Sequence, residues 1–239
     1  MNAAQQANLT RLRAAFPGRA GLGAYLDEPK AWPGSRVIFH TAGHVAIHDL
    51  YPKSFIHCLL LPRAPAKRAL HPFDALDGSD PEFLAETRAQ AARLRSLVAA
   101  ELRRLLGRDS AAEAVRNAVL DGTADADADG GLLPDGRDWE AEVRVGVHAV
   151  PSMDHLHIHV LSPDMAGSGM KKKNHYLSFN TPFFVDLADF PLAADDPRRQ
   201  GGLIKMHPMA CWRCQKDFGN KFEALKRHLA EEFEEWKKE

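Results

Sequence analysis

The segment His155-Leu156-His157-Ile158-His159-Val160-Leu161 places three histidines at alternating positions, with aliphatic residues between them. In a β-strand, side chains at alternate positions point to the same face. We therefore expect a row of three imidazoles on one face and a row of aliphatic side chains on the other. Burying polar rings is costly unless their nitrogens are bonded, so such a row needs a chemical use. The segment predicts both a core strand and the centre of a functional site.

The strands around this segment follow from the same alternation. Residues 143–150 alternate like a strand and carry a fourth histidine, His148. If this strand pairs antiparallel with the histidine segment, His148 lies near the three other imidazoles. Further strands are expected over residues 37–39, 44–48 and 55–61, the last ended by Pro62. The fold class predicted is α+β, with an antiparallel sheet and flanking helices.

The clearest helix is expected from Ser79 to Leu106. Ser79 or Asp80 can cap it, and Pro81 suits its first turn. A less regular helix, interrupted by Pro17 and Gly18, is expected over residues 7–26. The long helix should bury one face, formed by its apolar residues at helical spacing: Leu94, Leu97, Val98, Leu102 and Leu105.

The bulk properties bound the function classes. The chain has 239 residues, 45% of them hydrophobic, and a formal net charge of −1. No global basic field attracts nucleic acid, so such a partner must meet a local patch. No apolar run is long enough for a membrane span or a signal-peptide core, so we expect an intracellular protein without a membrane partner. The acidic residues 121–131 are interpreted as a flexible surface loop, with cation binding as the alternative.

A metal site is predicted at the C-terminus. Cys211 and Cys214 form a C-x-x-C motif, and thirteen residues separate Cys214 from His228. Glu232 follows His228 at i+4 on a predicted helix over 220–236 and shares its face. Two thiolates, an imidazole and a carboxylate can close a tetrahedral site, so one structural zinc per chain is expected. The alternative for Glu232 is a solvated acid within an acidic run.

The domain organisation predicted has three parts. Residues 1–192 form the domain that contains the histidine row. Residues 193–204, rich in Pro, Gly, Asp and Arg, form a linker. Residues 205–239 form the small zinc module.

The histidine row alone leaves three chemistries open. The imidazoles could be structural, they could bind zinc, or they could take part in nucleotidyl transfer. In the third case a neutral imidazole attacks the α-phosphorus of a nucleotide and forms a covalent nucleotidyl-histidine, which water then hydrolyses.

The row resembles the signature of the histidine-triad family, and its neighbouring motifs resemble the aprataxin family. These motifs are Asp49-Leu-Tyr-Pro-Lys53-Ser54, His148-Ala-Val-Pro-Ser152-Met153 and Lys173-Asn-His175-Tyr-Leu-Ser-Phe-Asn180-Thr181. The fungal members of that family carry a zinc finger whose last ligand is glutamate. Aprataxins remove AMP from the 5′-phosphate of DNA ends left by abortive ligation.

The resemblance implies a role for each matching residue. His157 is the nucleophile, His155 and His159 orient it and contact phosphate oxygens, and His148 protonates the departing phosphate oxygen. Asp49 holds the ribose, and the phosphate lies near Lys53, Ser54, Ser152 and Met153. The residues implied to contact DNA are Lys171, Lys172, Lys173, His175, Tyr176 and Ser178. Position alone adds three weaker candidates in the zinc module, which lie before or at the start of the predicted helix and away from the acidic tail: Arg213, Lys216 and Lys221.

The resemblance also implies the partners and the location. The substrate is a nicked or 5′-adenylated DNA, with RNA–DNA junctions left open, and AMP is the product. The protein is expected to be a nuclear monomer. The alternatives are a hydrolase of dinucleoside polyphosphates or nucleoside phosphoramidates, and a non-catalytic nucleic-acid adaptor.

Two positions depart from the aprataxin pattern. Asp154 directly precedes the histidine row, where a carboxylate can repel phosphate. Aprataxins also present an aromatic wedge near the N-terminus, but Arg19-Ala-Gly-Leu-Gly23 contains no aromatic residue. Phe16 is the candidate wedge, and the alternative is that it packs in the core.

Overall fold

The computed structural model describes the whole chain except residues 1–9, 11–13, 126–130 and 201. Its centre is an antiparallel sheet of six strands in the order β1-β2-β3-β5-β4-β6. The strands are β1 (Val37–His40), β2 (His44–His48), β3 (His57–Pro62), β4 (Arg144–His148), β5 (Ile158–Leu161) and β6 (Phe184–Asp186). This confirms the expected α+β fold with an antiparallel sheet.

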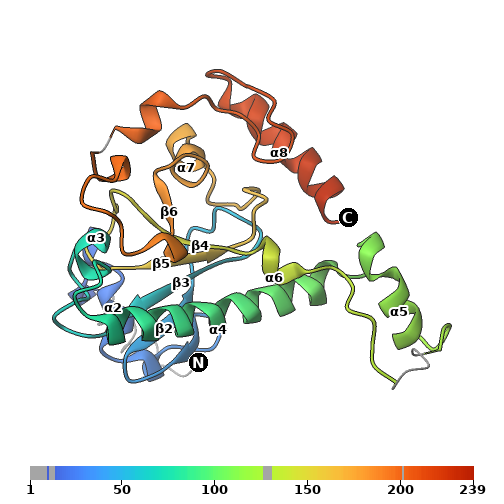
Figure 1. The fold of residues 1–239 in the computed structure, drawn as a ribbon, viewed down its shortest axis with the longest axis horizontal. Coiled ribbons are helices and arrows are strands. Elements are labelled where there is room, and N and C mark those ends of the chain that lie inside the picture. Colours follow the sequence, from blue (N-terminus) through green and yellow to red (C-terminus); the bar gives the residue numbers. More distant parts are fainter. Residues whose placement is uncertain (1–9, 11–13, 126–130, 201) are drawn as a thin grey trace.

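The described α-helices are α2 (Gly23–Leu26), α3 (Pro72–Ala75), α4 (Pro81–Leu106), α5 (Ala114–Leu120), α6 (Trp139–Glu142), α7 (Lys173–Phe179) and α8 (Phe222–Trp236). Most of them pack around this sheet, and α5 extends away from it. The short 3-10 helices are η1 (Gly18–Ala20), η2 (Pro29–Ala31), η3 (Ala111–Glu113), η4 (Leu187–Asp189), η5 (Pro197–Gln200) and η6 (Leu203–Met206). The long α4 lies along one face of the sheet (Figure 1).

The pairing of β3 with β5 sorts their side chains between two faces. Leu59 lies opposite His159, and Leu60 lies opposite Ile158. Leu60, Ile158 and Val160 belong to the core cluster that packs against α4. The alternate residues, which include His57 and His159, face the other side. One face of the sheet is therefore core, and the other is left for a site.

Helix α4 begins where the sequence predicts. The Asp80 carboxylate caps it by accepting the Phe83 N–H at 3.0 Å, and Pro81 occupies its first turn. The buried stripe follows i+4 steps through Leu94, Val98, Leu102 and Leu106. Leu97 and Leu105 were wrongly assigned to this stripe, because they lie on its flank and are more than two-fifths exposed.

The histidine row is not a single strand. Strand β5 begins at Ile158, so only His159 of the three lies within it. The Leu156 N–H pairs instead with the Arg68 carbonyl at 2.8 Å, outside the sheet. The expected alternation therefore holds for His157 and His159 and ends before His155.

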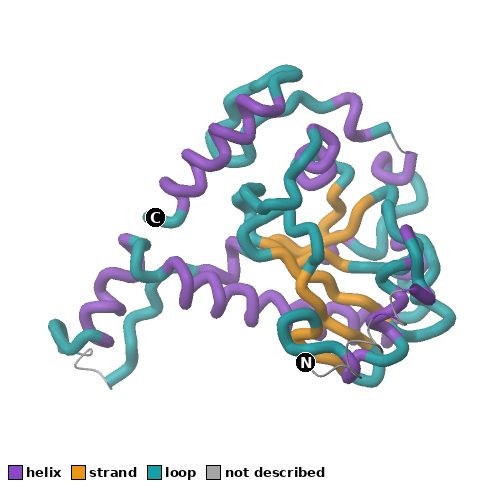
Figure 2. The backbone as a smooth tube through the Cα atoms, turned by 180° about the vertical axis from the view of Figure 1, so that it is seen from behind, coloured by secondary structure: helices purple, strands orange, loops and turns teal. Residues whose placement is uncertain are grey.

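The acidic region lies in an arm that extends beyond the sheet. Helix α5 and the chain around it project from the end of α4, as Figures 1 and 2 both show. Residues 121–125 are turns and coil at the end of α5, and Arg108 pairs with Asp121. The central part of the predicted loop, residues 126–130, lies outside the described residues.

The C-terminal module packs against the rest of the chain. One hydrophobic cluster joins Leu161 and Leu177 to Met209, Leu225 and Leu229 of the module. Trp236, at the end of α8, is almost fully buried, and its indole N–H donates to Glu142 at 2.9 Å. Among its described residues, the predicted linker 193–204 contains η5 and the start of η6, which are short 3-10 helices.

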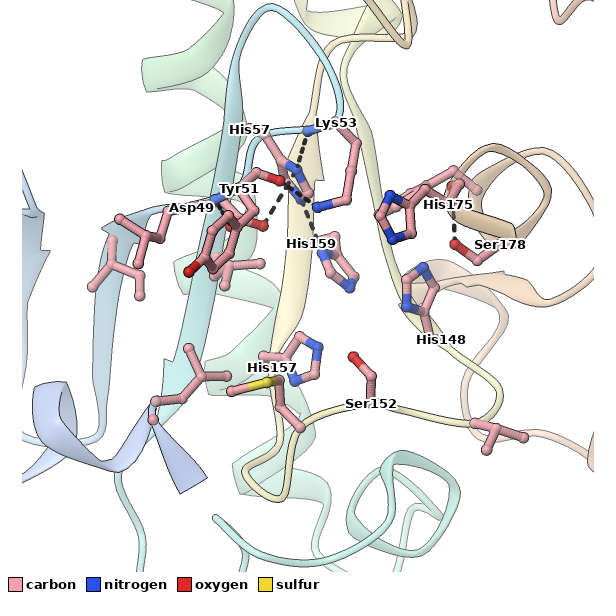
Figure 3. Close-up of a pocket in the computed structure, with 18 of the residues that line it drawn as sticks. Asp49, Tyr51, Lys53, His57, His148, Ser152, His157, His159, His175 and Ser178 are labelled. Atoms are coloured by element: carbon pink, nitrogen blue, oxygen red, sulfur yellow. Dashed lines mark hydrogen bonds and ion pairs between the residues drawn. The ribbon is translucent and has the colours of Figure 1, made fainter. Parts of the chain in front are cut away.

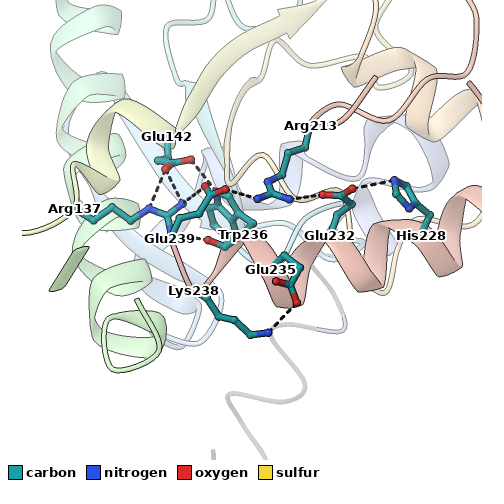
Figure 4. Close-up of polar contacts among 9 residues, drawn as sticks. All are labelled: Arg137, Glu142, Arg213, His228, Glu232, Glu235, Trp236, Lys238 and Glu239. Carbon is teal, nitrogen blue, oxygen red and sulfur yellow. Dashed lines mark hydrogen bonds and ion pairs between the residues drawn. The ribbon is translucent and has the colours of Figure 1, made fainter. Parts of the chain in front are cut away.

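Figure 4 shows polar contacts that continue this packing. Arg137 donates to the Trp236 carbonyl at 2.7 Å and to Glu142 at 2.7 Å. The C-terminal residue Glu239 lies close to Arg137 and also pairs with Arg213. The end of α8 is thus held to the segment around α6 by hydrogen bonds and ion pairs as well as by apolar packing.

Candidate active site and zinc-binding centre

A cavity of about 610 Å³ opens on the face of the sheet opposite α4. Its polar end is formed by His57, His148, His157 and His159 together with Lys53 (Figure 3). Strands β3, β4 and β5 supply His57, His148 and His159, and His157 directly precedes β5. The pairing of β4 with β5 brings His148 to His159, with ring centroids 4.5 Å apart, as the sequence predicts. This volume falls in the range of small-molecule sites.

The backbone orients the His157 ring. Its Nδ1 lies 2.8 Å from the carbonyl oxygen of His155. A carbonyl only accepts, so Nδ1 carries the proton and Nε2 carries the lone pair. Burial is the largest effect on this group and lowers the pKa of His157, so the ring is neutral near pH 7. A neutral imidazole with a free Nε2 lone pair is the nucleophilic form.

A chain of hydrogen bonds orients His159 in the opposite sense. The Lys53 N–H donates to Nδ1 of His57 at 3.1 Å, so the proton of the neutral His57 ring is on Nε2. That nitrogen lies 2.9 Å from Nδ1 of His159 and donates to it. His159 therefore carries its own proton on Nε2, which is buried without a partner among the described residues. This series of hydrogen bonds therefore leaves the Nε2–H of His159 as a donor with no partner among the described residues.

His57 is a site residue that the sequence analysis missed. It sits inside the apolar stretch of β3, where it resembles one more buried position. Its pKa is lowered to about 4, mainly by burial, while Asp49 opposes the shift. The one signal that could have found His57 is its position three residues after Ser54, the end of the Asp49-to-Ser54 motif.

Asp49, His57 and His159 place ligand atoms within 4.8 Å of one another, a grouping that could hold a metal. The 2.9 Å hydrogen bond between His57 and His159 already uses one nitrogen of each ring. His155 takes no part in this grouping, so the three-imidazole zinc site considered from the sequence does not form.

His148 lies among aromatic rings at the end of β4. Its centroid is 4.6 Å from that of Phe179, and its Nε2 is buried without a partner among the described residues. Burial, followed by the positive neighbours, holds the pKa of His148 well below its usual value. The ring is therefore neutral in the free protein, and only an anionic ligand nearby favours the cation that a general acid requires.

Four predicted residues other than the histidines line the same cavity. Asp49 follows β2 and accepts the Tyr51 N–H at 2.7 Å. Ser152 lies exposed at the rim, and Met153 packs beside it. The Lys53 ammonium donates to the Tyr51 carbonyl, and burial lowers its pKa. These groups lie where a nucleotide's ribose and phosphate would meet the histidines.

Two predicted phosphate contacts are contradicted by the structure. The Ser54 side chain is fully buried, and its hydroxyl faces the Met165 sulfur at 3.9 Å. The His155 ring does not line the cavity, because it lies against Phe16 with ring centroids 6.2 Å apart. His155 acts on the site through its carbonyl oxygen, which orients His157.

The predicted DNA-contact residues separate into exposed and buried groups. Lys171 and Lys172 are exposed before α7, whereas Lys173 donates to Asn220 of the zinc module. His175 and Ser178 line the cavity from α7 (Figure 3). Tyr176 is fully buried, and its hydroxyl donates to the Ala210 carbonyl at 2.8 Å. The prediction that Tyr176 contacts DNA is therefore wrong.

The two departures from the aprataxin pattern have structural explanations. The Asp154 carboxylate pairs with Arg19 at 3.1 Å, and both are exposed, so its charge is countered outside the histidine cluster. Phe16 lies half-buried over Gly23, where a Cβ would be 2.4 Å from its ring, and it lines the cavity. In this structure the Phe16 ring packs against Gly23 and His155 and does not project as a wedge.

Four donor groups converge in the C-terminal module. The ligand atoms of Cys211, Cys214, His228 and Glu232 lie within 4.8 Å of one another. His228 Nε2 is 3.1 Å from both the Cys214 sulfur and a Glu232 oxygen. The spacing and chemistry of these groups fit a tetrahedral zinc ion. Arg213, a weaker DNA candidate, pairs with Glu232 and Glu239 and is therefore not a free cation.

The comparisons with known proteins agree with both sites. Residues 33–166 match the family described as the HIT domain, and residues 180–235 match the C2HE / C2H2 / C2HC zinc-binding finger. An aprataxin-like protein of Saccharomyces cerevisiae is 33% identical over 90% of this chain and 95% of its own length. The chain belongs to the aprataxin family. An aprataxin-like protein of Schizosaccharomyces pombe is 29% identical over 91% of this chain.

Solved structures of this family share the fold. The aprataxin orthologue Hnt3 in complex with DNA is 28% identical, covers 91% of this chain and 96% of its own, and superposes with a TM-score of 0.68. Hnt3 in complex with DNA and guanosine covers 90% of this chain and 95% of its own, with a TM-score of 0.65 and 27% identity. This aprataxin-family chain is a HIT hydrolase with a zinc-finger region.

Proposed function

We propose that this chain is a DNA 5′-adenylate hydrolase that releases AMP from the 5′-adenylated ends left by abortive ligation. The observation that carries the proposal is His157, whose Nδ1 is held by the His155 carbonyl at 2.8 Å while its ring lines the cavity. Family membership supports DNA as the substrate, because relatives have been solved in complex with DNA.

The first step forms a covalent intermediate. The His157 Nε2 lone pair attacks the phosphorus of the AMP group and forms a P–N bond. The P–O bond to the DNA 5′-phosphate breaks, and the departing oxygen takes a proton from His148. The unpaired Nε2–H of His159 and the Lys53 ammonium are placed to stabilise the charge that grows on the phosphoryl oxygens.

The second step restores the enzyme. Water attacks the phosphorus, the P–N bond breaks, and AMP leaves. His148, now neutral, accepts the proton from the water. The Nδ1–H of His157 stays bonded to the His155 carbonyl throughout, which holds the ring in line.

The remaining assignments extend this proposal. Asp49 holds the ribose, and Ser152 and Met153 flank the phosphate. Lys171, Lys172 and residues of α7 line the path of the DNA. Residues 1–192 form the hydrolase domain, 193–204 connect it to the module, and 205–239 form the finger with one structural zinc held by Cys211, Cys214, His228 and Glu232.

The protein acts as a monomer in the nucleus, where its substrate lies. Among the described helices, none has the length and hydropathy needed to cross a bilayer. Sedimentation of the purified chain and imaging of a tagged copy test these two assignments.

The second candidate is a hydrolase of dinucleoside polyphosphates or phosphoramidates, which the same histidines could serve. The experiment compares AMP release from a 5′-adenylated nick and from a dinucleoside polyphosphate. We expect kcat/KM to be at least about 100-fold higher for the nick, because the DNA adds phosphate contacts outside the cavity. Equal rates on the two substrates, or a preference for the dinucleoside polyphosphate, would refute the proposal.

A further inference from the structure

The proposed zinc site differs in charge from a finger with two cysteines and two histidines. Two thiolates and the Glu232 carboxylate bring three negative charges to an ion with two positive ones, and His228 binds a metal in its neutral form. One negative charge is therefore in excess, and a second imidazole in place of the carboxylate would remove it. The excess is costly here, because Glu232 is only 8% exposed and a buried charge needs a partner.

The Arg213 guanidinium contacts this carboxylate on the side away from the other ligands (Figure 4). Its Nη1 donates to Oε2 of Glu232 at 2.5 Å. The second carboxylate oxygen, Oε1, faces the ligand cluster and lies 3.1 Å from Nε2 of His228. The two oxygens of Glu232 thus differ in their surroundings: one is free to bind a metal, and the other is held by a cation.

The metal-binding motif itself fixes the position of Arg213. The residue lies between Cys211 and Cys214, in a turn where the Gln215 N–H donates to the Cys211 carbonyl at 3.1 Å. The second terminal nitrogen of the guanidinium pairs with the C-terminal residue, Glu239. Because two carboxylates hold it, the guanidinium has a defined place beside the ligand cluster, and its planar group of donors suits such a double contact.

We propose that Arg213 is a positioning residue of the zinc site, which holds the Glu232 carboxylate in the orientation that binds the ion and offsets the excess negative charge. The inference rests on the proposed zinc site and deepens it. Without this cation, the two thiolates repel the carboxylate, and its side chain is free to turn towards water. Groups that hold a metal ligand from behind typically contribute about 10- to 100-fold to metal affinity.

The alternatives are that Arg213 serves only the C-terminus or that it serves DNA. In the first case, only its pair with Glu239 matters. In the second case, the cation has to leave both carboxylates before it can meet a phosphate, although its hydrogen bond to Glu232 is already made at 2.5 Å. The contacts favour the role at the metal site, and Glu239→Gln separates this role from one at the C-terminus.

The experiment measures the zinc affinity of the full chain by competition with a chelating indicator. We expect Arg213→Met to weaken zinc binding at least about tenfold. Arg213→Lys should recover part of this loss, because lysine keeps the charge but not the planar group of donors. Two variants should bind zinc as wild type does: Glu239→Gln, which leaves the contact with Glu232, and the matched control Arg227→Met, an exposed arginine on α8.

An exchange of the fourth ligand makes the test specific. In Glu232→His both imidazoles are neutral and the excess charge is gone, so the addition of Arg213→Met should not weaken zinc binding further. A loss of the same size in both backgrounds would overturn the role of Arg213, because it would show a general effect on the finger. If Glu232→His binds no zinc, the variants in the wild-type background decide alone.

In that background, three results would overturn the inference: full affinity in Arg213→Met, equal affinities of Arg213→Met and Arg213→Lys, or a loss as large with Glu239→Gln as with Arg213→Met. A wild-type chain that binds no zinc would instead refute the proposed zinc site itself. AMP release from a 5′-adenylated nick, measured on the same wild-type preparation, tests the proposed hydrolase separately from both.

Discussion

At the scale of single residues, the site depends on where two protons lie. The His155 carbonyl fixes the proton of His157 on Nδ1, and the Lys53 N–H, acting through His57, fixes that of His159 on Nε2. One ring thus becomes a nucleophile and its neighbour a donor. This second assignment holds only while His57 is neutral, because a protonated His57 could not accept the Lys53 N–H.

The protonation of His57 gives a prediction about stability. Its pKa is about 4 in the folded chain and 6.5 in the unfolded one, so the unfolded state binds the proton first. The stabilisation is complete above pH 6.5 and is lost as the pH falls to about 4. Between pH 7.5 and 4, the free energy of unfolding should fall by about 3 kcal/mol more for wild type than for His57→Gln.

Denaturant titrations at both pH values measure this difference, and the variant comparison cancels the other histidines and the zinc site. His207→Gln, at an exposed position, is the control and should behave like wild type. An identical pH dependence for wild type and His57→Gln would show that His57 does not titrate as described.

Sequence alone predicted some of these residues and not others. His148, His157 and His159 were found because spacing and strand pairing bring them together. Ser54 and Tyr176 were misplaced because a motif does not say which side of a turn or helix faces the core. His57 was missed because a buried functional histidine and a buried structural one have the same apolar neighbours.

At the scale of elements, the long helix α4 supports the face of the sheet opposite the cavity. Its existence and cap were predictable, because Asp80, Pro81 and the apolar period all agree. The buried face of α4 was harder to predict, because its apolar stripe is broad and the packing against the sheet decides which of these residues are buried. Leu102 is fully buried, whereas Leu105, three residues later, is 42% exposed.

This difference gives a matched pair of variants. Leu102→Ala should lower the free energy of unfolding by about 3 kcal/mol, because it leaves a cavity under the sheet. Leu105→Ala removes the same atoms from a half-exposed flank and should cost less than about 1 kcal/mol. Urea titrations at pH 7.5 measure both, and equal losses would contradict the described orientation of α4.

At the scale of the whole molecule, the zinc module is docked rather than tethered. Trp236 is buried against α6, and the N–H groups of Ala111 and Ala112 donate to the carbonyls of Lys238 and Glu239 at 2.8 and 2.9 Å. The sequence showed the metal ligands because their spacing is local. It could not show this docking, because Arg137, Glu142 and Trp236 lie in separate segments that only the fold brings together.

Zinc should therefore stabilise this docking as well as the finger. Metal analysis of the purified protein should find about one zinc per chain, and Cys214→Ser should lower it. Amide exchange at residues 111 and 112 should then become faster, because His228 and Glu232 lose the ion that fixes α8. Cys58→Ala, a cysteine outside the cluster, should keep both the metal and the protection. If the amides of residues 111 and 112 exchange as slowly in zinc-free Cys214→Ser as in wild type, zinc does not stabilise the docking.

The exposed lysines before α7 give a prediction for DNA affinity. Removing Lys171 and Lys172 together should weaken nick binding and reduce the slope of log affinity against log salt by about 2, since each phosphate contact releases a counterion. The charge-matched control is Arg104→Ala with Arg108→Ala, two exposed arginines at the end of α4 and directly after it. Fluorescence anisotropy at several salt concentrations measures the slopes. Equal slopes for wild type and the lysine variant would show that Lys171 and Lys172 do not contact DNA phosphates.

The central claim is that His157 carries the nucleotide during turnover. A 5′-adenylated nick is mixed with enzyme, quenched within one turnover, and the AMP-modified residue is identified by mass spectrometry of peptides. The account predicts AMP on His157, an adduct that persists in His155→Ala, and none in His157→Ala, which should still bind the nick. An adduct on another histidine, or AMP release by His157→Ala at the wild-type rate, would contradict it.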